Sequence, residues 1–189
     1  MKTFKEYYLL KESFTDNAHI FDMDDTLITT KAQIIVKDEN DNIIKKLSPA
    51  EYNTYKKQPN EKFDFSEFDN PEIIHQTGEP TKYFKVIKNI SDAIKQKRSN
   101  SFIYILTARG SAVKNSIYEF LKDRGIEVRP VEIYTIGDAQ HKSVAELKKE
   151  VLQKIRNKHI GNVTFYDDDE KNIELAKQVD GIKTRLVKV

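Results

Sequence analysis

The chain has 189 residues, a formal net charge of +2 and no cysteine. This length fits one domain with a substantial buried core. Basic and acidic residues nearly balance, so the net charge gives no argument for nucleic-acid binding. It does not exclude local basic patches. Without cysteine, disulfides, thiol catalysis and thiolate metal sites are excluded. The four scattered histidines do not predict a zinc site.

No apolar stretch of the sequence approaches the length of a membrane span. Near the N-terminus, charges lie on both sides of a short apolar patch, and no small-residue cleavage site follows it. This pattern predicts an amphipathic helical lead over residues 1–17 rather than a signal peptide. We therefore expect a cytoplasmic protein that has no membrane partner.

The first predicted strand ends in a cluster of carboxylates. Residues 19–21 lead directly into Asp22, Asp24 and Asp25. An apolar run closed by acids is typical of a buried strand that delivers its loop to one edge of a sheet. Because clustered carboxylates repel each other, a cation that neutralises them is expected beside this loop.

Residues 30–80 lack a clear helical or strand alternation, and we interpret them as an insertion after the first aspartate loop. Residues 32–37 and 43–47 flank a polar turn, as in a β-hairpin. The aromatic side chains of Phe63, Phe65 and Phe68 either form a small core for the insertion or stack on a base. The insertion is a candidate small cap or flap over the site.

Helix-like and strand-like patterns alternate along the rest of the chain. Helices are predicted around residues 83–94, 113–121, 143–155 and 173–179, and strands over residues 101–106, 132–136, 163–166 and 184–189. Gly125 is a predicted C-terminal cap, and Ser143 with Glu146 forms a predicted capping box. The helix after that box has a predicted apolar stripe of Val144, Leu147, Val151 and Ile155.

This alternation predicts one α/β domain over residues 1–189, with a parallel sheet and helices on both faces. Its catalytic core comprises residues 18–29 and 81–189. In such a sheet, ligands bind beyond the carboxyl ends of the strands. A second pair of acids, Asp167 and Asp168, ends a late strand. If that strand neighbours the first, the two clusters form an oxygen-ligand site that suits Mg²⁺.

Four short motifs occur in order along the chain: Asp22-x-Asp24-x-Thr26, Thr107 at a strand end, Lys142 at a helix start and the Asp167-Asp168 pair. In kind and order they resemble the four motifs of the haloacid dehalogenase (HAD) superfamily, and the resemblance covers most of the chain from His19 onward. It implies a HAD-like Rossmannoid fold. It also implies a Mg²⁺-dependent phosphohydrolase that uses an aspartyl-phosphate intermediate. An aspartate at the position of Asp24 favours phosphatase over dehalogenase chemistry in that superfamily.

Phosphoryl transfer needs an in-line nucleophile, neutralised charge and a proton for the leaving group. Asp22 is the candidate nucleophile and a metal ligand, and Asp24 is the candidate general acid and then base. By the resemblance, the backbone carbonyl of Asp24 also coordinates Mg²⁺. The hydroxyl of Thr107 and the neighbouring backbone N–H groups are predicted to bind a phosphoryl oxygen.

Two basic residues are candidates for binding the phosphate. Lys142 directly precedes the Ser143 cap, so we expect its ammonium to reach the site from a helix N-terminus. Lys148 and Lys149 are rivals that lie further into the helix, where we expect them to face solvent. Arg109 either forks onto a substrate phosphate or is a solvated loop residue.

In the second acidic pair, Asp168 is the predicted direct metal ligand. Asp167 is predicted either to ligate the metal as well or to hydrogen-bond to groups that do. The sequence does not decide which of these two aspartates has which role. Asn172 either orients one of these carboxylates or is a solvated helix residue.

In this superfamily the cap decides the substrate, and an insertion of about fifty residues is small. An open site suits a phosphorylated nucleic-acid end or a protein, while small substrates need the hairpin or a partner subunit to cover it. The chain also resembles phosphatase domains of polynucleotide end-repair enzymes and small HAD-like proteins of tailed bacteriophages. The leading prediction is a phosphomonoesterase acting on nucleotides or polynucleotide ends. The alternatives are a protein or small-metabolite phosphatase and a non-catalytic HAD-fold binding module.

Overall fold

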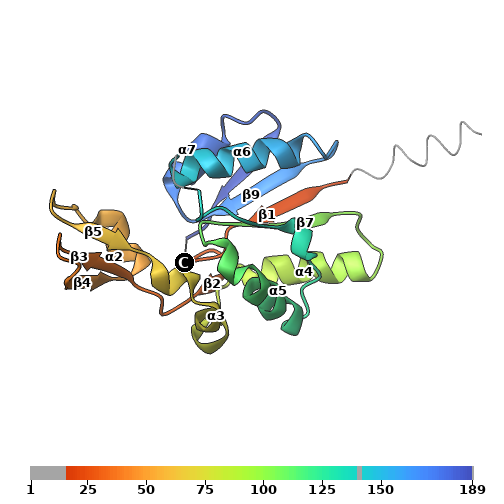
Figure 1. Cartoon of the computed structure of the whole chain (residues 1–189). Helices are drawn as coiled ribbons and strands as arrows, with labels where there is room; N and C mark the ends of the chain where they lie inside the picture. Colours follow the sequence, from red (N-terminus) through yellow and green to blue (C-terminus); the bar gives the residue numbers. More distant parts are fainter. Residues whose placement is uncertain (1–15, 140–141, 189) are drawn as a thin grey trace, which may run out of the picture.

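The computed structural model describes residues 16–139 and 142–188. Most of the predicted helical lead at residues 1–17 therefore lies outside the described residues, as does Val189. At the centre lies a five-stranded sheet with the order β10-β9-β1-β7-β8, and all of its neighbours pair in parallel (Figure 1). Its strands are β1 (Ala18–Phe21), β7 (Phe102–Thr107), β8 (Ile133–Thr135), β9 (Val163–Asp167) and β10 (Ile182–Leu186).

Helices cover both faces of this sheet, as predicted (Figure 1). They are α4 (Phe84–Lys95) and α5 (Lys114–Asp123) on one face, and α6 (Val144–Arg156) and α7 (Glu170–Ala176) on the other. Short 3-10 turns, η2 (Ser111–Val113) and η3 (Pro130–Glu132), flank α5 and β8. Successive strand residues point to opposite faces, so Phe21 joins the core under α4 and α5 while Ile20 joins the core under α6 and α7. The α/β class is confirmed.

Local signals in the sequence predicted the helix ends well. Gly125 has a φ of +72°, a left-handed conformation that glycine adopts without strain. Beside it, the N–H of Ile126 donates to the carbonyl of Leu121 at 2.9 Å. The capping box of Ser143 and Glu146 is also present at the start of α6.

The predicted apolar stripe of α6 is confirmed at Val151 and Ile155 and wrong at Val144. The residues that α6 buries are Lys148, Val151, Leu152 and Ile155, whereas Val144 is 42% exposed. A lysine thus belongs to the face that packs on the sheet. The last strand is shifted as well, because β10 pairs with β9 from Ile182 onward and ends at Leu186. Its predicted place at the sheet edge is confirmed.

The insertion begins and ends at a two-stranded antiparallel stem of β2 (Ile28–Thr29) and β6 (Glu79–Pro80). It lies beyond the end of the sheet toward which β1 runs, at the left of Figure 1. Its elements are β3 (Ile34–Lys37), β4 (Ile43–Leu47), α2 (Pro49–Thr54), β5 (Lys62–Asp64), the 3-10 turn η1 (Ser66–Asp69) and α3 (Pro71–Thr77). The predicted hairpin is confirmed, because β3 pairs antiparallel with β4; β5 adds a third strand.

Two of the three insertion phenylalanines contribute to a small core. Phe63 and Phe68 pack on the buried side chains of Ile34, Val36 and Leu47, while Phe65 stays 43% exposed. The helix α3 was not predicted, and it attaches the insertion to the main domain. Its Ile74 is fully buried in the core under α4 and α5, and α3 packs against α5.

Among the described residues, no helix combines the length and apolarity that crossing a membrane requires.

The burial pattern of α6 predicts which substitutions on this helix change the free energy of unfolding. Leu152 is fully buried and Val144 is 42% exposed on the same helix. Leu152→Ala should lower the free energy of unfolding by about 2–5 kcal/mol, because it removes packed methyl groups and leaves a cavity. Val144→Ala should change it by less than about 0.5 kcal/mol. Urea unfolding of both variants measures this, and equal losses would contradict the burial pattern.

Candidate active site

Three carboxylates meet at the carboxyl edge of the sheet. Asp22 directly follows β1, and Asp167 is the last residue of the adjacent β9, with Asp168 next to it. The N–H of Asp22 donates to the carbonyl of Tyr166 at 2.9 Å, so the pairing of the two strands continues into the site. Carboxylate oxygens of the three aspartates lie within 4.8 Å of one another. The predicted meeting of the two aspartate clusters is confirmed.

A buried lysine from α6 lies between two of these acids. The Nζ atom of Lys148 donates to Oδ1 of Asp22 at 2.6 Å and to Oδ2 of Asp167 at 2.7 Å. Lys148 is 2% exposed, so the expectation that it faces solvent is wrong. Burial of a charged ammonium is stable here because both of its partners are carboxylates.

The prediction of Lys142 as the site lysine is also wrong. Its side chain is 49% exposed and forms an ion pair with Glu150 of α6. The physical reason is the phase of α6, whose sheet-facing side carries the residue at position 148 and not the residue before the cap. Val151, Leu152 and Ile155 follow Lys148 at helical spacing in the sequence, and that pattern was the available signal.

The cluster keeps an excess of negative charge. Burial raises the pKa of Asp22 well above its ordinary value, Lys148 opposes this, and Asp167 and Asp168 raise the pKa further. Burial and then the charge of Asp167 raise the pKa of Asp168 to about 6. Burial alone would lower the pKa of Lys148, but Asp167 and Asp22 outweigh it and raise that pKa. Three carboxylates against one ammonium leave two negative charges, the charge that a divalent cation neutralises.

Asp167 and Asp168 have different surroundings. Both oxygens of Asp167 accept hydrogen bonds from protein groups, namely Lys148, the Asn172 amide and the N–H of Asp169. Asn172 is 5% exposed, so it orients a carboxylate, and the solvated alternative is wrong.

Within the described residues, Asp22 and Asp168 each use only one oxygen in a hydrogen bond, to Lys148 and to Thr26 Oγ1 respectively. Their second oxygens remain available to a ligand. Carboxylate oxygens in a buried, negatively charged cluster are the donor set that Mg²⁺ prefers. The residues therefore fit a magnesium ion, with Asp22 and Asp168 best placed to ligate it.

The structure pairs Arg109 with Asp24. Its Nε and Nη2 atoms donate to Asp24 Oδ2 at 2.8 Å and to Asp24 Oδ1 at 2.6 Å. Arg109 is 2% exposed, whereas the side chain of Asp24 is 22% exposed. The solvated alternative for Arg109 is therefore wrong, and in this structure the two N–H donors of its fork bind Asp24.

Thr107 ends β7, the other neighbour of β1 in the sheet. It is fully buried, and its Oγ1 accepts a hydrogen bond from the N–H of Arg109 at 3.2 Å. The structure thus places Thr107 at the same sheet edge as Asp22, as expected.

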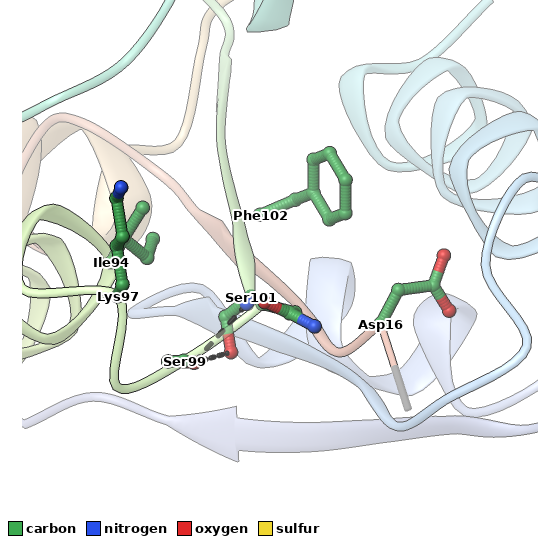
Figure 2. Close-up of a pocket in the computed structure, with 7 residues that line it drawn as sticks. Asp16, Ile94, Lys97, Ser99, Ser101 and Phe102 are labelled. Atoms are coloured by element: carbon green, nitrogen blue, oxygen red, sulfur yellow. Dashed lines mark hydrogen bonds between the residues drawn. The ribbon is translucent and has the colours of Figure 1, made fainter. Parts of the chain in front are cut away.

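A pocket of about 650 Å³ lies at the opposite edge of the sheet, at the amino ends of β1 and β7 (Figure 2). It is lined by Asp16, Ile94, Lys97, Ser99, Asn100, Ser101 and Phe102. Within this lining, Ser99 Oγ donates to Ser101 Oγ at 2.7 Å. None of the predicted site residues lines the pocket, so it is separate from the acidic cluster.

Comparison with known proteins identifies the family. The model of the DUF2608 family, described as a protein of unknown function, matches residues 4–153. The chain belongs to the DUF2608 family. A comparison with curated proteins finds no match.

Among solved structures, this DUF2608 protein is similar to the HAD domain of effector protein Lem4 from Legionella pneumophila, determined as an inactive mutant. The two are 14% identical with a TM-score of 0.51, and the match covers 92% of this chain and 86% of that chain. At this identity the similarity shows the fold alone. The fold is HAD-like, as the order of the motifs indicated.

The excess charge predicts how stability depends on pH once metal is removed by a chelator. The pKa of Asp168 is raised from 3.8 to about 6 in the folded protein, so the folded state binds this proton more tightly than the unfolded state. The contribution of Asp168 to stability therefore falls as pH rises through this interval. Asp168→Asn should be more stable than the wild type at pH 7, by a margin that shrinks toward pH 4.

Unfolding in urea with a chelator, at several pH values, measures this margin. Adding Mg²⁺ should stabilise the wild type more than Asp168→Asn, because binding to the folded state alone raises stability. The exposed acid Glu174, which pairs with Lys177 on the surface, is the matched control as Glu174→Gln. An identical pH dependence for all three proteins would refute the charge assignment.

Proposed function

We propose that this DUF2608 protein is a Mg²⁺-dependent phosphomonoester hydrolase that works through an aspartyl-phosphate intermediate. The observation that carries this proposal is the buried ammonium of Lys148, which bridges Asp22 and Asp167 at 2.6 and 2.7 Å beside Asp168. A stable core gains little from three carboxylates held together with a single ammonium. Phosphoryl transfer, in contrast, needs a fixed nucleophile and a strong local positive charge.

In the first step, a carboxylate oxygen of Asp22 attacks the phosphorus atom and the bond to the leaving-group oxygen breaks. Lys148 holds Asp22 in position and Asp167 holds Lys148. The hydroxyl of Thr107 and the N–H of Ala108 bind phosphoryl oxygens, because the N–H groups of Arg109 and Gly110 already donate to Thr107 Oγ1 and Asp69 Oδ1. The leaving-group oxygen takes a proton from Asp24, whose side chain is 22% exposed.

In the second step, Asp24 accepts a proton from a water molecule as that water attacks the phosphorus of the aspartyl phosphate. The bond to Asp22 breaks, inorganic phosphate leaves and both aspartates return to their starting state. A bound Mg²⁺, held by Asp22, Asp168 and the backbone carbonyl of Asp24, would neutralise negative charge on the carboxylates and the phosphoryl group.

For the substrate, we propose nucleotides or phosphorylated polynucleotide ends. The insertion is small, with a core of only a few side chains, and such a cap suits an extended substrate. Phe65, 43% exposed on the insertion, is an aromatic surface on which a base can stack. Phosphopeptides and small phosphorylated metabolites are the alternative substrates. A panel that holds free nucleotides, 3′- and 5′-phosphorylated oligonucleotides, phosphopeptides and sugar phosphates decides between them by kcat/KM.

The covalent mechanism predicts the effect of Asp22→Asn. An amide does not attack phosphorus, so hydrolysis of an aryl phosphate should fall below detection. Asp22→Asn leaves Lys148 paired with Asp167, so the protein should stay folded. A chelator should abolish wild-type turnover, and Mg²⁺ should restore it. Turnover that survives in the variant would exclude Asp22 as the nucleophile.

The two candidate lysines make a matched pair of variants. Lys148→Ala should lower kcat by about 100-fold or more, since it removes a preorganised positive charge at the reacting group. It should also lower the free energy of unfolding by about 3–5 kcal/mol, because two buried carboxylates lose their partner. Lys142→Ala removes only a surface ion pair, so both quantities should stay near the wild-type values. A larger kinetic defect in Lys142→Ala would reverse the assignment of the site lysine.

A further inference from the structure

We propose that the insertion positions the proton-transferring carboxylate Asp24, and that Arg109 is the positioning residue through which it acts. This inference rests on the proposed phosphatase function and extends it to the control of one catalytic group. It starts from the guanidinium of Arg109, which lies in the interior and contacts both the catalytic loop and the insertion.

The first step of the argument is the contact with Asp24. Two parallel N–H donors of Arg109 meet the two oxygens of Asp24 at 2.8 and 2.6 Å. Such a fork fixes the plane of the carboxylate as well as its position. The side chain of Asp24 is 22% exposed and that of Arg109 is 1% exposed, so a buried cation holds a carboxylate that solvent can reach.

The second step is what holds Arg109. Its Nη1 donates to the carbonyl oxygen of Phe68 at 2.8 Å, and its Nη2 also donates to Thr30 Oγ1 at 3.2 Å. The guanidinium carbon lies 5.0 Å from the centre of the Phe68 ring, at cation–π distance. Phe68 and Thr30 both belong to the insertion. The insertion therefore supplies every partner of this side chain in the described residues other than Asp24.

The third step is the backbone next to Arg109. The N–H of Gly110 donates to Asp69 Oδ1 at 3.0 Å, so the insertion also holds the loop that carries Arg109. A Cβ atom at Gly110 would lie 2.5 Å from that same Asp69 oxygen and 2.7 Å from Asp138 Oδ1, so a larger residue would displace these two carboxylates. The N–H of the next residue, Ser111, donates to Asp138 Oδ2 at 3.0 Å.

The fourth step is that the insertion itself has a fixed place. The turn η1 packs against η2, and α3 buries Ile74 in the main core. The N–H of Gln33 donates to Glu67 Oε2 at 2.9 Å, which ties η1 to the strand region of the insertion. A displacement of η1 would thus pass to Phe68 and Asp69, from them to Arg109, and from Arg109 to Asp24.

A double-mutant cycle on turnover tests the inference. Arg109→Gln removes the fork, and we expect kcat to fall about 10- to 100-fold, as for a misplaced catalytic group. In an Asp24→Asn background the same change should lower kcat by less than about threefold, because a residue that acts through Asp24 has nothing left to position. An activated aryl phosphate, whose leaving group needs little protonation, keeps the Asp24→Asn enzyme measurable. With this substrate, kcat reports the second step, in which Asp24 takes a proton from the attacking water. Equal losses in both backgrounds would overturn the inference.

A second measurement separates positioning from phosphate binding. Inhibition by inorganic phosphate reports contacts with the phosphoryl group, and Arg109→Gln should change its inhibition constant by less than about threefold. A rise in that constant in parallel with the loss of kcat would mean that Arg109 binds substrate, and would also overturn the inference. Arg109→Lys keeps the charge without the fork, so it should retain most of the kcat defect.

The insertion is tested by variants outside the catalytic residues. Asp69→Ala removes the bond to Gly110, and it should lower kcat with a loss that again vanishes in the Asp24→Asn background. Its control is Asp64→Asn, which breaks the Lys37 ion pair within the insertion and should leave kcat within about twofold. Equal kcat losses for the two would mean that general destabilisation of the insertion is responsible. Thermal unfolding of each variant verifies that it is folded.

The outcome for the wild type distinguishes the two proposals. A wild-type protein that hydrolyses no phosphomonoester with Mg²⁺ present overturns the proposed function, and this inference falls with it. An active wild type with additive variants overturns the inference alone.

Discussion

The arrangement of the whole domain depends on one interaction, the burial of the Lys148 ammonium between Asp22 and Asp167. A charge taken out of water is stable only when its partners compensate for the lost hydration. That requirement fixes which face α6 presents to the sheet, and it requires β1 and β9 to be neighbours so that their end residues share one cation. Asn172 and the N–H of Asp169 complete the hydrogen bonds of Asp167. The cluster is thus a structural junction of α6, α7, β1 and β9, and its remaining negative charge fits it for a divalent cation.

The strand ends were predictable from the sequence, and so were the acids at them. Short apolar runs such as residues 19–21 and 163–166 predict buried strands. Because helices alternate with these strands along the chain, the sheet is predicted to be parallel. Parallel strands put their carboxyl ends together, so Asp22, Thr107 and Asp168 could be placed at one edge without knowing a single distance. Lys148 could not be found in this way, because a search for apolar stripes discards a lysine. Only the helical spacing from Lys148 to Val151, Leu152 and Ile155 indicates that this lysine lies on the buried face of α6. A second, overlapping apolar stripe that begins at Val144 competes with this pattern.

The insertion was harder to predict, for a different physical reason. Its elements are short: β5 spans Lys62–Asp64 and α3 spans Pro71–Thr77. Short elements owe their conformation to tertiary contacts more than to their own propensities. The hairpin of β3 and β4 was visible because its turn has a strong local signal, whereas α3 is stabilised by placing Ile74 in a core made by distant helices. The contact between the insertion and Arg109 could not be predicted from the sequence either. Phe68 makes it with its backbone carbonyl, a group that every residue has.

Two buried cationic side chains therefore each hold one carboxylate of the first aspartate loop. Asp22 is held by Lys148 from α6, and Asp24 is held by Arg109 from the loop after β7. In the proposed mechanism, the nucleophile is therefore held by the main core alone, whereas the proton-transferring group depends also on the insertion. In the proposed mechanism, a change in the insertion alters how the leaving group is protonated without moving the attacking oxygen. The reason is that the two cations reach neighbouring carboxylates through separate elements of the fold.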